Sequence, residues 1–203
     1  MKNIKINALA SITVNILNII FPLITNPYLT RILSKDNYGH FNNANTWASF
    51  IVPIAAFGIY NYGIRSISKV KDSREKINYV FSKLFYLSIF TSLSVTTVYF
   101  LIIGLGSDIH TLKILYYILG FQALIQFLNI EWMNEAYENY TFILYKTLFI
   151  RILMLVSIFA FVKNEDDIIP YALIMTAVTF INYLISFIWI KKEISFVKIP
   201  IRE

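Results

Sequence analysis

The chain has 203 residues, of which 57% are hydrophobic and 17% aromatic, and its mean hydropathy is +0.61. A soluble domain has about 45–50% apolar residues, so this composition excludes a soluble globular class and indicates an integral membrane protein. The net charge is +6, and the absence of cysteine excludes disulfides, thiolate nucleophiles and zinc–thiolate sites.

Apolar runs recur along the whole chain, and each is about long enough to cross a ~30 Å hydrocarbon core. We therefore expect an all-α, polytopic membrane protein, a bundle of six transmembrane helices. One membrane domain takes up residues 1–203, and no stretch is left for a soluble domain. The predicted spans are 6–31, 40–62, 79–103, 111–129, 141–162 and 168–190.

Lysine and arginine are unevenly distributed between the predicted loops. With the N-terminus inside, the inner segments hold most of these residues, from Lys2 to Arg202. Cytoplasmic loops concentrate Lys and Arg, so both termini are predicted to be cytoplasmic, as an even number of spans requires. The cations assigned to the outer side are Arg31, Lys35, Lys113 and Lys163.

The first span contains Pro22 and Pro27, close to its outer end. Proline removes a backbone N–H and its ring crowds the carbonyl four residues back, so we expect the helix to be bent or broken there. Such a break is tolerated in lipid only where other groups satisfy the freed carbonyls. The two prolines are therefore hinge candidates, and a kink that only improves packing is the alternative interpretation.

A polar stripe runs along the same span at helical spacing. Its members follow one another by three or four residues, so they share one face of the helix. A polar stripe in a membrane helix faces other helices or water, because an unpaired polar group in hydrocarbon costs several kcal/mol. It predicts a cavity lining, or alternatively a helix–helix seam joined by amide hydrogen bonds. The stripe consists of Asn7, Ser11, Asn15, Asn18, Pro22 and Thr25.

The inner loop after the second span is rich in Lys and Arg, which serves either to orient the chain or to contact anionic lipid head groups. The capping-box spacing of Asp72 and Glu75 predicts a helix start near Ser73.

In the fourth span, Gln122 and Gln126 lie on one face. The acidic and aromatic segment 131–140 follows, and we expect it at the inner interface.

Arg151 lies near the middle of the fifth span. A cation at that depth costs a few kcal/mol and is by default a functional candidate. The alternative is an arginine that snorkels towards Lys146 and the inner surface.

At the outer turn, Asp167 is a plausible N-cap for the sixth helix. The acid cluster 165–167 has no histidine beside it, so no metal site is expected.

The sequence shows no arrangement of side chains typical of a catalytic site. Every Asp and Glu is predicted to lie in a loop or at a terminus, and no nucleophile and base are paired. We expect neither an enzyme nor a cofactor. The amides and guanidinium groups in the spans suit a polar substrate that carries negative charge, because Arg binds phosphate oxygens in a bidentate manner.

Several blocks of the chain resemble the bacterial polysaccharide flippases, of the multidrug/oligosaccharidyl-lipid/polysaccharide exporter superfamily. Residues 26–33 (NPYLTRIL), followed by Tyr38 and Gly39, are similar to the first-helix signature of this family. Residues 57–65 (FGIYNYGIR) and the basic stretch to Asp72 resemble the end of its second helix and its inner loop. Further matches, in chain order, are Glu131-Trp132, Arg151 and residues 162–167 (VKNEDD).

The chain departs from the family in two respects. A glutamine and a glycine are expected after Glu131-Trp132, whereas this sequence has Asn134 and Glu135. Family members also have about twice as many helices, arranged as two lobes around a central cavity. This sequence corresponds to the N-terminal lobe alone.

The resemblance implies that the chain is the N-terminal lobe of a flippase in the bacterial inner membrane. Such a flippase moves undecaprenyl-diphosphate-linked oligosaccharides for capsule or O-antigen by alternating access. The implied partners are this substrate, membrane lipids, and a second lobe or polysaccharide-assembly proteins. The chain would be incomplete on its own, and the alternative is a non-transporting subunit that binds lipid carriers or assembly enzymes. The implied diphosphate ligands are Arg31, Arg65 and Arg151, and the implied sugar-path residues are Asn15, Asn18, Asn26, Gln122 and Gln126.

Overall fold

The computed structural model describes residues 4–106 and 110–199, and every regular element in these ranges is a helix. Six segments are long and apolar enough to cross a membrane, which confirms the predicted all-α, six-span fold. Lys2 and Arg202, two of the residues behind the topology prediction, lie outside the described residues. The elements are α1 (Ile4–Ile32), α2 (Lys35–Ala56), α3 (Ile59–Lys69), α4 (Arg74–Gly106), α5 (His110–Leu124), the 3₁₀ helix η1 (Ile125–Leu128), α6 (Glu131–Ala136), α7 (Tyr140–Phe161) and α8 (Ile168–Ile190).

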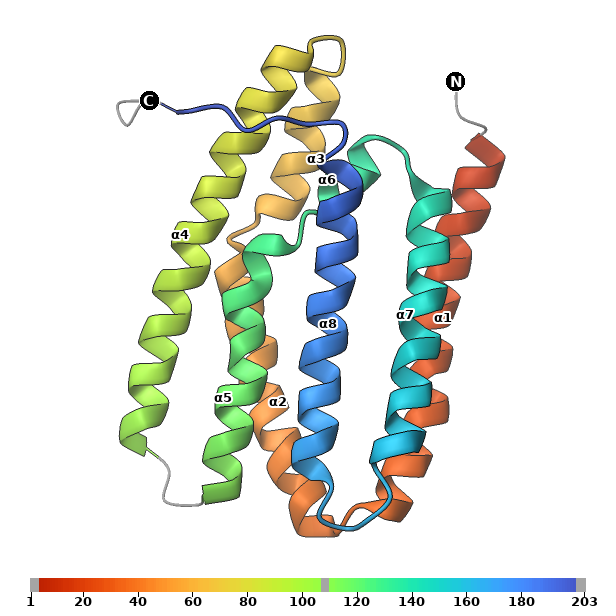
Figure 1. Cartoon of the computed structure of the whole chain (residues 1–203), viewed down its shortest axis with the longest axis vertical. Helices are drawn as coiled ribbons and strands as arrows, with labels where there is room; N and C mark the ends of the chain where they lie inside the picture. Colours follow the sequence, from red (N-terminus) through yellow and green to blue (C-terminus); the bar gives the residue numbers. More distant parts are fainter. Residues whose placement is uncertain (1–3, 107–109, 200–203) are drawn as a thin grey trace.

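The long helices form two groups with α8 between them (Figure 1). Helix α1 packs along α7, and it has few contacts with the rest of the bundle. Helices α2, α4 and α5 pack on one another, and α8 packs against both α5 and α7. The start of α1 and the segment after α8 lie at the same end of the molecule, where the short helices α3 and α6 are also found.

The second and fourth spans are interrupted helices. Phe57 and Gly58 are both left-handed, with φ of 49° and 67°, and they separate α2 from α3. Asn129 and Ile130 separate η1 from α6. The predicted span 40–62 is thus divided between α2 and α3, because a left-handed pair ends the α-helical hydrogen-bond ladder. The predicted end of the fourth span at residue 129 coincides with the break between η1 and α6, where φ is negative at both residues.

Helix α1 is continuous through both of its prolines. The side chains of Pro22 and Pro27 are exposed, so their rings lie on the outside of the bundle rather than in a packed seam. Of the two outcomes expected for this helix, bent or broken, the break is therefore wrong. A hinge at these prolines stays a prediction.

Two apolar clusters hold the bundle together. The first joins α1, α2, α4, α5, α7 and α8 around residues such as Leu29, Leu119 and Ile158. The second joins α3, α4, α6 and the end of α8 around Phe81 and Trp132. Many large apolar side chains remain exposed, as expected for helices that face lipid. On α1 these exposed residues are Ile6, Leu9, Ile12, Ile16, Ile19, Ile20, Leu23 and Ile24.

The segment after α8 crosses α4 at the same end as α3 (Figure 1). Its backbone N–H groups at Ser195 and Val197 donate to the side chains of Asn78 and Ser82, at 2.9 Å in both cases. Phe196 packs among the aromatic rings of the second cluster. These contacts attach the segment after α8 to α4, although the bonded residues are 117 and 115 positions apart in the sequence.

Candidate functional site

A polar cavity of about 570 Å³ lies between the α1–α7 pair and α8. The interrupted spans contribute to it through α3, α5 and α6. Amide, hydroxyl and charged side chains dominate its lining, which is unusual inside a bundle whose outer surface is apolar. The lining residues are Val14, Asn15, Asn18, Tyr60, Gln122, Asn129, Glu131, Glu135, Ile143, Lys146, Thr147, Ile150, Arg151, Met154, Val178, Thr179, Asn182 and Tyr183.

Arg151 reaches from α7 across the cavity wall to α1. Its Nη2 donates to Asn18 Oδ1 at 2.6 Å, and its guanidinium carbon lies 4.7 Å from the centroid of the Phe21 ring. The Nε atom is buried without a partner, and within the described residues no carboxylate forms an ion pair with this side chain. The charge of Arg151 is thus oriented by an amide and an aromatic face but is not neutralised.

The polar stripe of α1 divides between two environments. Asn15 and Asn18 line the cavity, and Asn18 also joins α1 to α7 through Arg151. Thr25 is buried and donates to the carbonyl of Phe21 in its own helix. Both interpretations of the stripe, a cavity lining and a helix–helix seam, therefore apply. Asn18 lines the cavity and also forms a hydrogen bond between two helices.

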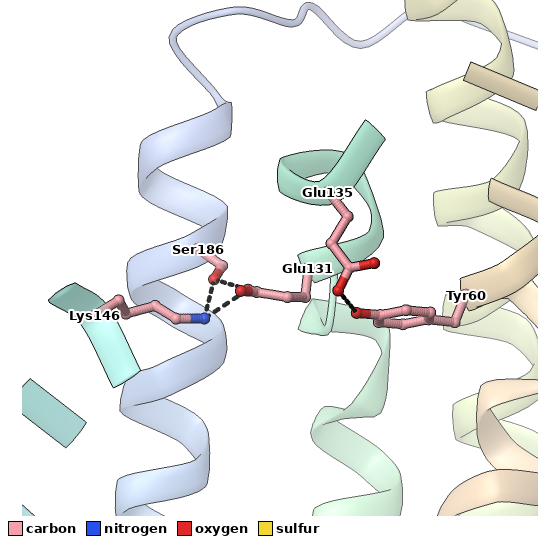
Figure 2. Close-up of polar contacts among 5 residues, drawn as sticks. All are labelled: Tyr60, Glu131, Glu135, Lys146 and Ser186. Atoms are coloured by element: carbon pink, nitrogen blue, oxygen red, sulfur yellow. Dashed lines mark hydrogen bonds and ion pairs between the residues drawn. The ribbon is translucent and has the colours of Figure 1, made fainter. Parts of the chain in front are cut away.

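A buried acid–base network forms the end of the cavity next to α6 (Figure 2). Lys146 Nζ donates to Glu131 Oε2 at 2.5 Å and to Ser186 Oγ at 2.8 Å, while Ser186 Oγ donates to the same carboxylate oxygen at 2.5 Å. The Lys146 side chain is 3% exposed and that of Glu131 is 16% exposed. The network thus connects α6, α7 and α8.

A second carboxylate lies one turn further along α6. Glu135 Oε1 accepts a hydrogen bond of 2.7 Å from the Tyr60 hydroxyl on α3 (Figure 2). Both residues line the cavity. The position of α6 on α3 depends on Gly63, because a Cβ atom there would lie 2.5 Å from the indole ring of Trp132.

Glu131 and Glu135 correct the expectation that every carboxylate lies in a loop or at a terminus. The fourth span does not end at residue 129 but continues through α6 to Ala136. Helix α6 is buried, with Trp132 and Met133 almost fully inaccessible, so its acids face the cavity rather than an open interface. Sequence reasoning missed the Glu131–Lys146 pair because the partners are on separate helices. The signal available was an acid and a lysine on adjacent apolar segments.

The two predicted glutamines are both hydrogen-bonded to α8. Gln122 lines the cavity and donates to Thr176 Oγ1 at 3.3 Å. Gln126 is buried just behind the lining, and its Oε1 accepts from the Tyr183 hydroxyl at 3.0 Å.

Three other predicted site residues lie outside the cavity lining. Arg31, at the end of α1, and Arg65, on α3, are exposed, and so is Asn26. Of the three arginines implied by the family resemblance, the structure brings only Arg151 together with the predicted amides Asn15, Asn18 and Gln122.

The acidic turn 165–167 forms hydrogen bonds with the residues just before it and with Asn37 of α2. Asp167 Oδ2 accepts from the backbone N–H groups of Lys163 and Asn164, which hold the pKa of Asp167 below its ordinary value. Asp166 accepts from the Asn37 amide at 3.0 Å. Asp167 takes the position before α8 as predicted, but its side chain stabilises the preceding turn rather than the helix start.

Comparison with known proteins identifies the family. The family model described as polysaccharide biosynthesis protein matches residues 4–202. This chain belongs to the polysaccharide biosynthesis protein family. The match covers nearly all of the chain, including every helix that lines the cavity, and it agrees with the resemblance to polysaccharide flippases found in the sequence.

This polysaccharide biosynthesis protein is also similar to a protein of Escherichia coli (strain K12) named "Putative O-antigen transporter". The two are 31% identical over 64 residues, which are 32% of this chain and 15% of that relative. The matched segment thus spans much less than two thirds of the relative's length. No solved structure matches the chain.

Proposed function

We propose that this polysaccharide biosynthesis protein handles a lipid-linked oligosaccharide, as the N-terminal lobe of a flippase in the bacterial inner membrane. The substrate is an undecaprenyl-diphosphate-linked unit, and it passes between leaflets by alternating access. The observation that carries the proposal is a polar cavity inside a membrane bundle, with Arg151 unneutralised beside a set of amides.

The chemistry of the cavity supports a substrate with a diphosphate and sugar hydroxyls. Arg151 offers guanidinium N–H groups of the kind that bind phosphate oxygens. The amides of Asn15, Asn129 and Asn182 line the cavity, and within residues 4–106 and 110–199 the structure gives these side chains no hydrogen bond. Free amides can donate to and accept from hydroxyl groups.

The shape of the bundle supports alternating access with a second lobe. Interrupted helices near the binding site are a common feature of secondary transporters. Here Tyr60 follows the interruption between α2 and α3, and Glu131 and Glu135 follow the one between η1 and α6. All three residues line the cavity. We propose that the second lobe implied by the family resemblance forms the opposite wall of the substrate path, and that this lobe alone binds without transporting.

A binding measurement tests the proposal. The full chain in lipid nanodiscs is titrated with a polyprenyl-diphosphate-linked disaccharide, and Arg151→Ala is compared with wild type. Losing charged hydrogen bonds worth about 1.5–3 kcal/mol predicts an affinity lower by roughly 10- to 100-fold. Lys163→Ala is the matched control, because it removes one positive charge from the exposed turn before α8.

The control variant is expected to bind like wild type. Equal binding by wild type and Arg151→Ala would reject the proposed substrate site, and would favour a membrane scaffold that holds assembly proteins instead.

A further inference from the structure

Lys146 is a buried cation in the cavity wall that the proposed substrate contacts do not use. It lies on the same helix as Arg151, five residues earlier, or about 7.5 Å along the helix axis. Both side chains line the cavity. The difference between them is the partner, because Arg151 bonds to a neutral amide whereas Lys146 bonds to the Glu131 carboxylate.

The network around Lys146 is not saturated. Glu131 Oε2 accepts from both Lys146 and Ser186, but the second oxygen, Oε1, is buried without a partner. Lys146 uses two of the three hydrogens that an ammonium group carries. A buried ion pair is stabilising only when the remaining lone pairs and protons are satisfied, so a purely structural pair would be expected to fill these positions.

Within this cavity wall, Lys146 is paired with a single carboxylate, that of Glu131. The groups that face Glu131 are Tyr60 from α3, Glu135 from its own helix, Lys146 from α7, and Tyr183 and Ser186 from α8. Lys146 is the only cation among them in the described part of the chain. Glu131 therefore takes the place that an external anion would take at this lysine.

We propose that Glu131 is an internal counter-anion, and that a phosphate group entering the cavity displaces it from Lys146. Lys146 then joins Arg151 as a second anion-binding group, and the displaced carboxylate stays in the polar lining of the cavity. The inference rests on the proposed function, since it concerns the same cavity. It adds that binding of the anionic head group is coupled to rearrangement of α6 against α7 and α8.

Inorganic pyrophosphate is the probe for this exchange, since it carries the diphosphate charge without lipid or sugar. Its affinity is measured by calorimetry for the full chain in nanodiscs made of zwitterionic lipid. Glu131→Gln removes the competing charge and is expected to raise the affinity by about 10-fold or more, because the lysine then keeps only neutral partners. The double variant Glu131→Gln/Lys146→Ala is expected to lose this gain.

Glu138→Gln is the matched control. It also removes one carboxylate from an ion pair, but that pair, with Lys71, is exposed and outside the cavity. Its pyrophosphate affinity is expected to equal that of wild type. A Glu131→Gln variant that binds no more tightly than wild type overturns the inference.

If Glu131→Gln does not fold, Glu131→Asp keeps the acid but shortens its reach, and it is expected to bind more tightly than wild type. Unchanged affinity in that variant is equally contradictory.

The outcomes distinguish this inference from the proposed function. If Arg151→Ala weakens pyrophosphate binding but Glu131→Gln does not strengthen it, the counter-anion exchange is wrong and the substrate site stands. If neither wild type nor Glu131→Gln binds pyrophosphate, the cavity is not a diphosphate site, and both proposals fail.

Discussion

Substituting Gly63 tests how α6 is positioned at the cavity. A Cβ atom on Gly63 would lie 2.5 Å from Trp132 Cε3 and 2.7 Å from Cδ2, well inside the ~3.5–4.0 Å at which carbon atoms pack. The indole ring has little room to move away, because Trp132 is 2% exposed and its ring stacks on Phe81 at 5.9 Å. Gly63→Ala must therefore displace α6 from α3.

The size of the effect follows from two opposing contributions. Overpacking a core costs about 1–3 kcal/mol, whereas alanine is favoured over glycine in a helix by about 0.8–1.0 kcal/mol. Gly39→Ala, in α2, isolates the second contribution, because no atom lies within 4 Å of the added Cβ. The two variants should therefore differ in free energy of unfolding by about 1–3 kcal/mol, with Gly63→Ala the less stable.

Denaturant titration of both variants in the same detergent micelles, followed by tryptophan fluorescence, measures this difference. We also expect Gly63→Ala to weaken substrate binding, since Tyr60 and Glu135 face each other across the displaced contact. Equal stability of the two variants would refute the tight α3–α6 packing on which this reasoning depends.

Three further predictions concern other contacts. Glu131→Gln or Lys146→Met leaves one partner of a buried ion pair, and each is expected to lower the free energy of unfolding by about 3–5 kcal/mol. Their double variant should recover most of this loss in a double-mutant cycle, and simple additivity would argue against the pair. Tyr28→Phe removes the 2.8 Å hydrogen bond to the Val162 carbonyl, and it should cost about 1 kcal/mol in the same titration; no loss would mean that the bond contributes nothing. The pKa of Asp167 is lowered by backbone donors, so its stabilising effect is present above its ordinary pKa and is lost as the pH falls through the lowered pKa. Hydrogen-exchange protection of the two donor amides should fall over that acidic range in wild type and be low at all pH values in Asp167→Ala, whereas pH-independent protection in wild type would contradict this assignment.

The number of spans could be predicted because each is a long apolar run separated by polar residues, and hydropathy measures this directly. The interruptions could not be predicted in the same way. Gly58 is compatible with a left-handed turn, but Phe57 next to it gives no such signal, because a positive φ is uncommon for a bulky residue. Continuity of α1 through Pro22 and Pro27 was missed for the opposite reason, since local rules overestimated the disruption.

The site was predictable where it depends on helical spacing. Helical periodicity predicts Asn15, Asn18 and Gln122, depth in the span predicts Arg151, and all four line one cavity. Position along the sequence could not tell that Arg31 and Arg65 lie elsewhere, because this depends on how α1 and α3 are placed in the bundle.

The carboxylates needed tertiary information as well. Glu131 follows a helix end in the sequence, and only the packing of α6 brings it to Lys146. An acidic segment after a membrane span indicates a loop at the interface, unless a basic residue on another helix is known to pair with it. The buried network is therefore the feature of the site that the structure adds.

Access of the substrate to the cavity is the central claim, and the absence of cysteine makes it directly measurable. Asn182→Cys introduces a thiol into the cavity lining, and Ile16→Cys introduces one on the exposed apolar face of α1, outside the lining. A membrane-impermeant maleimide is expected to label the first variant and not the second, and a polyprenyl-diphosphate-linked oligosaccharide is expected to slow that labelling. Failure to label Asn182→Cys, or labelling that the oligosaccharide does not slow, would contradict a water-filled substrate cavity.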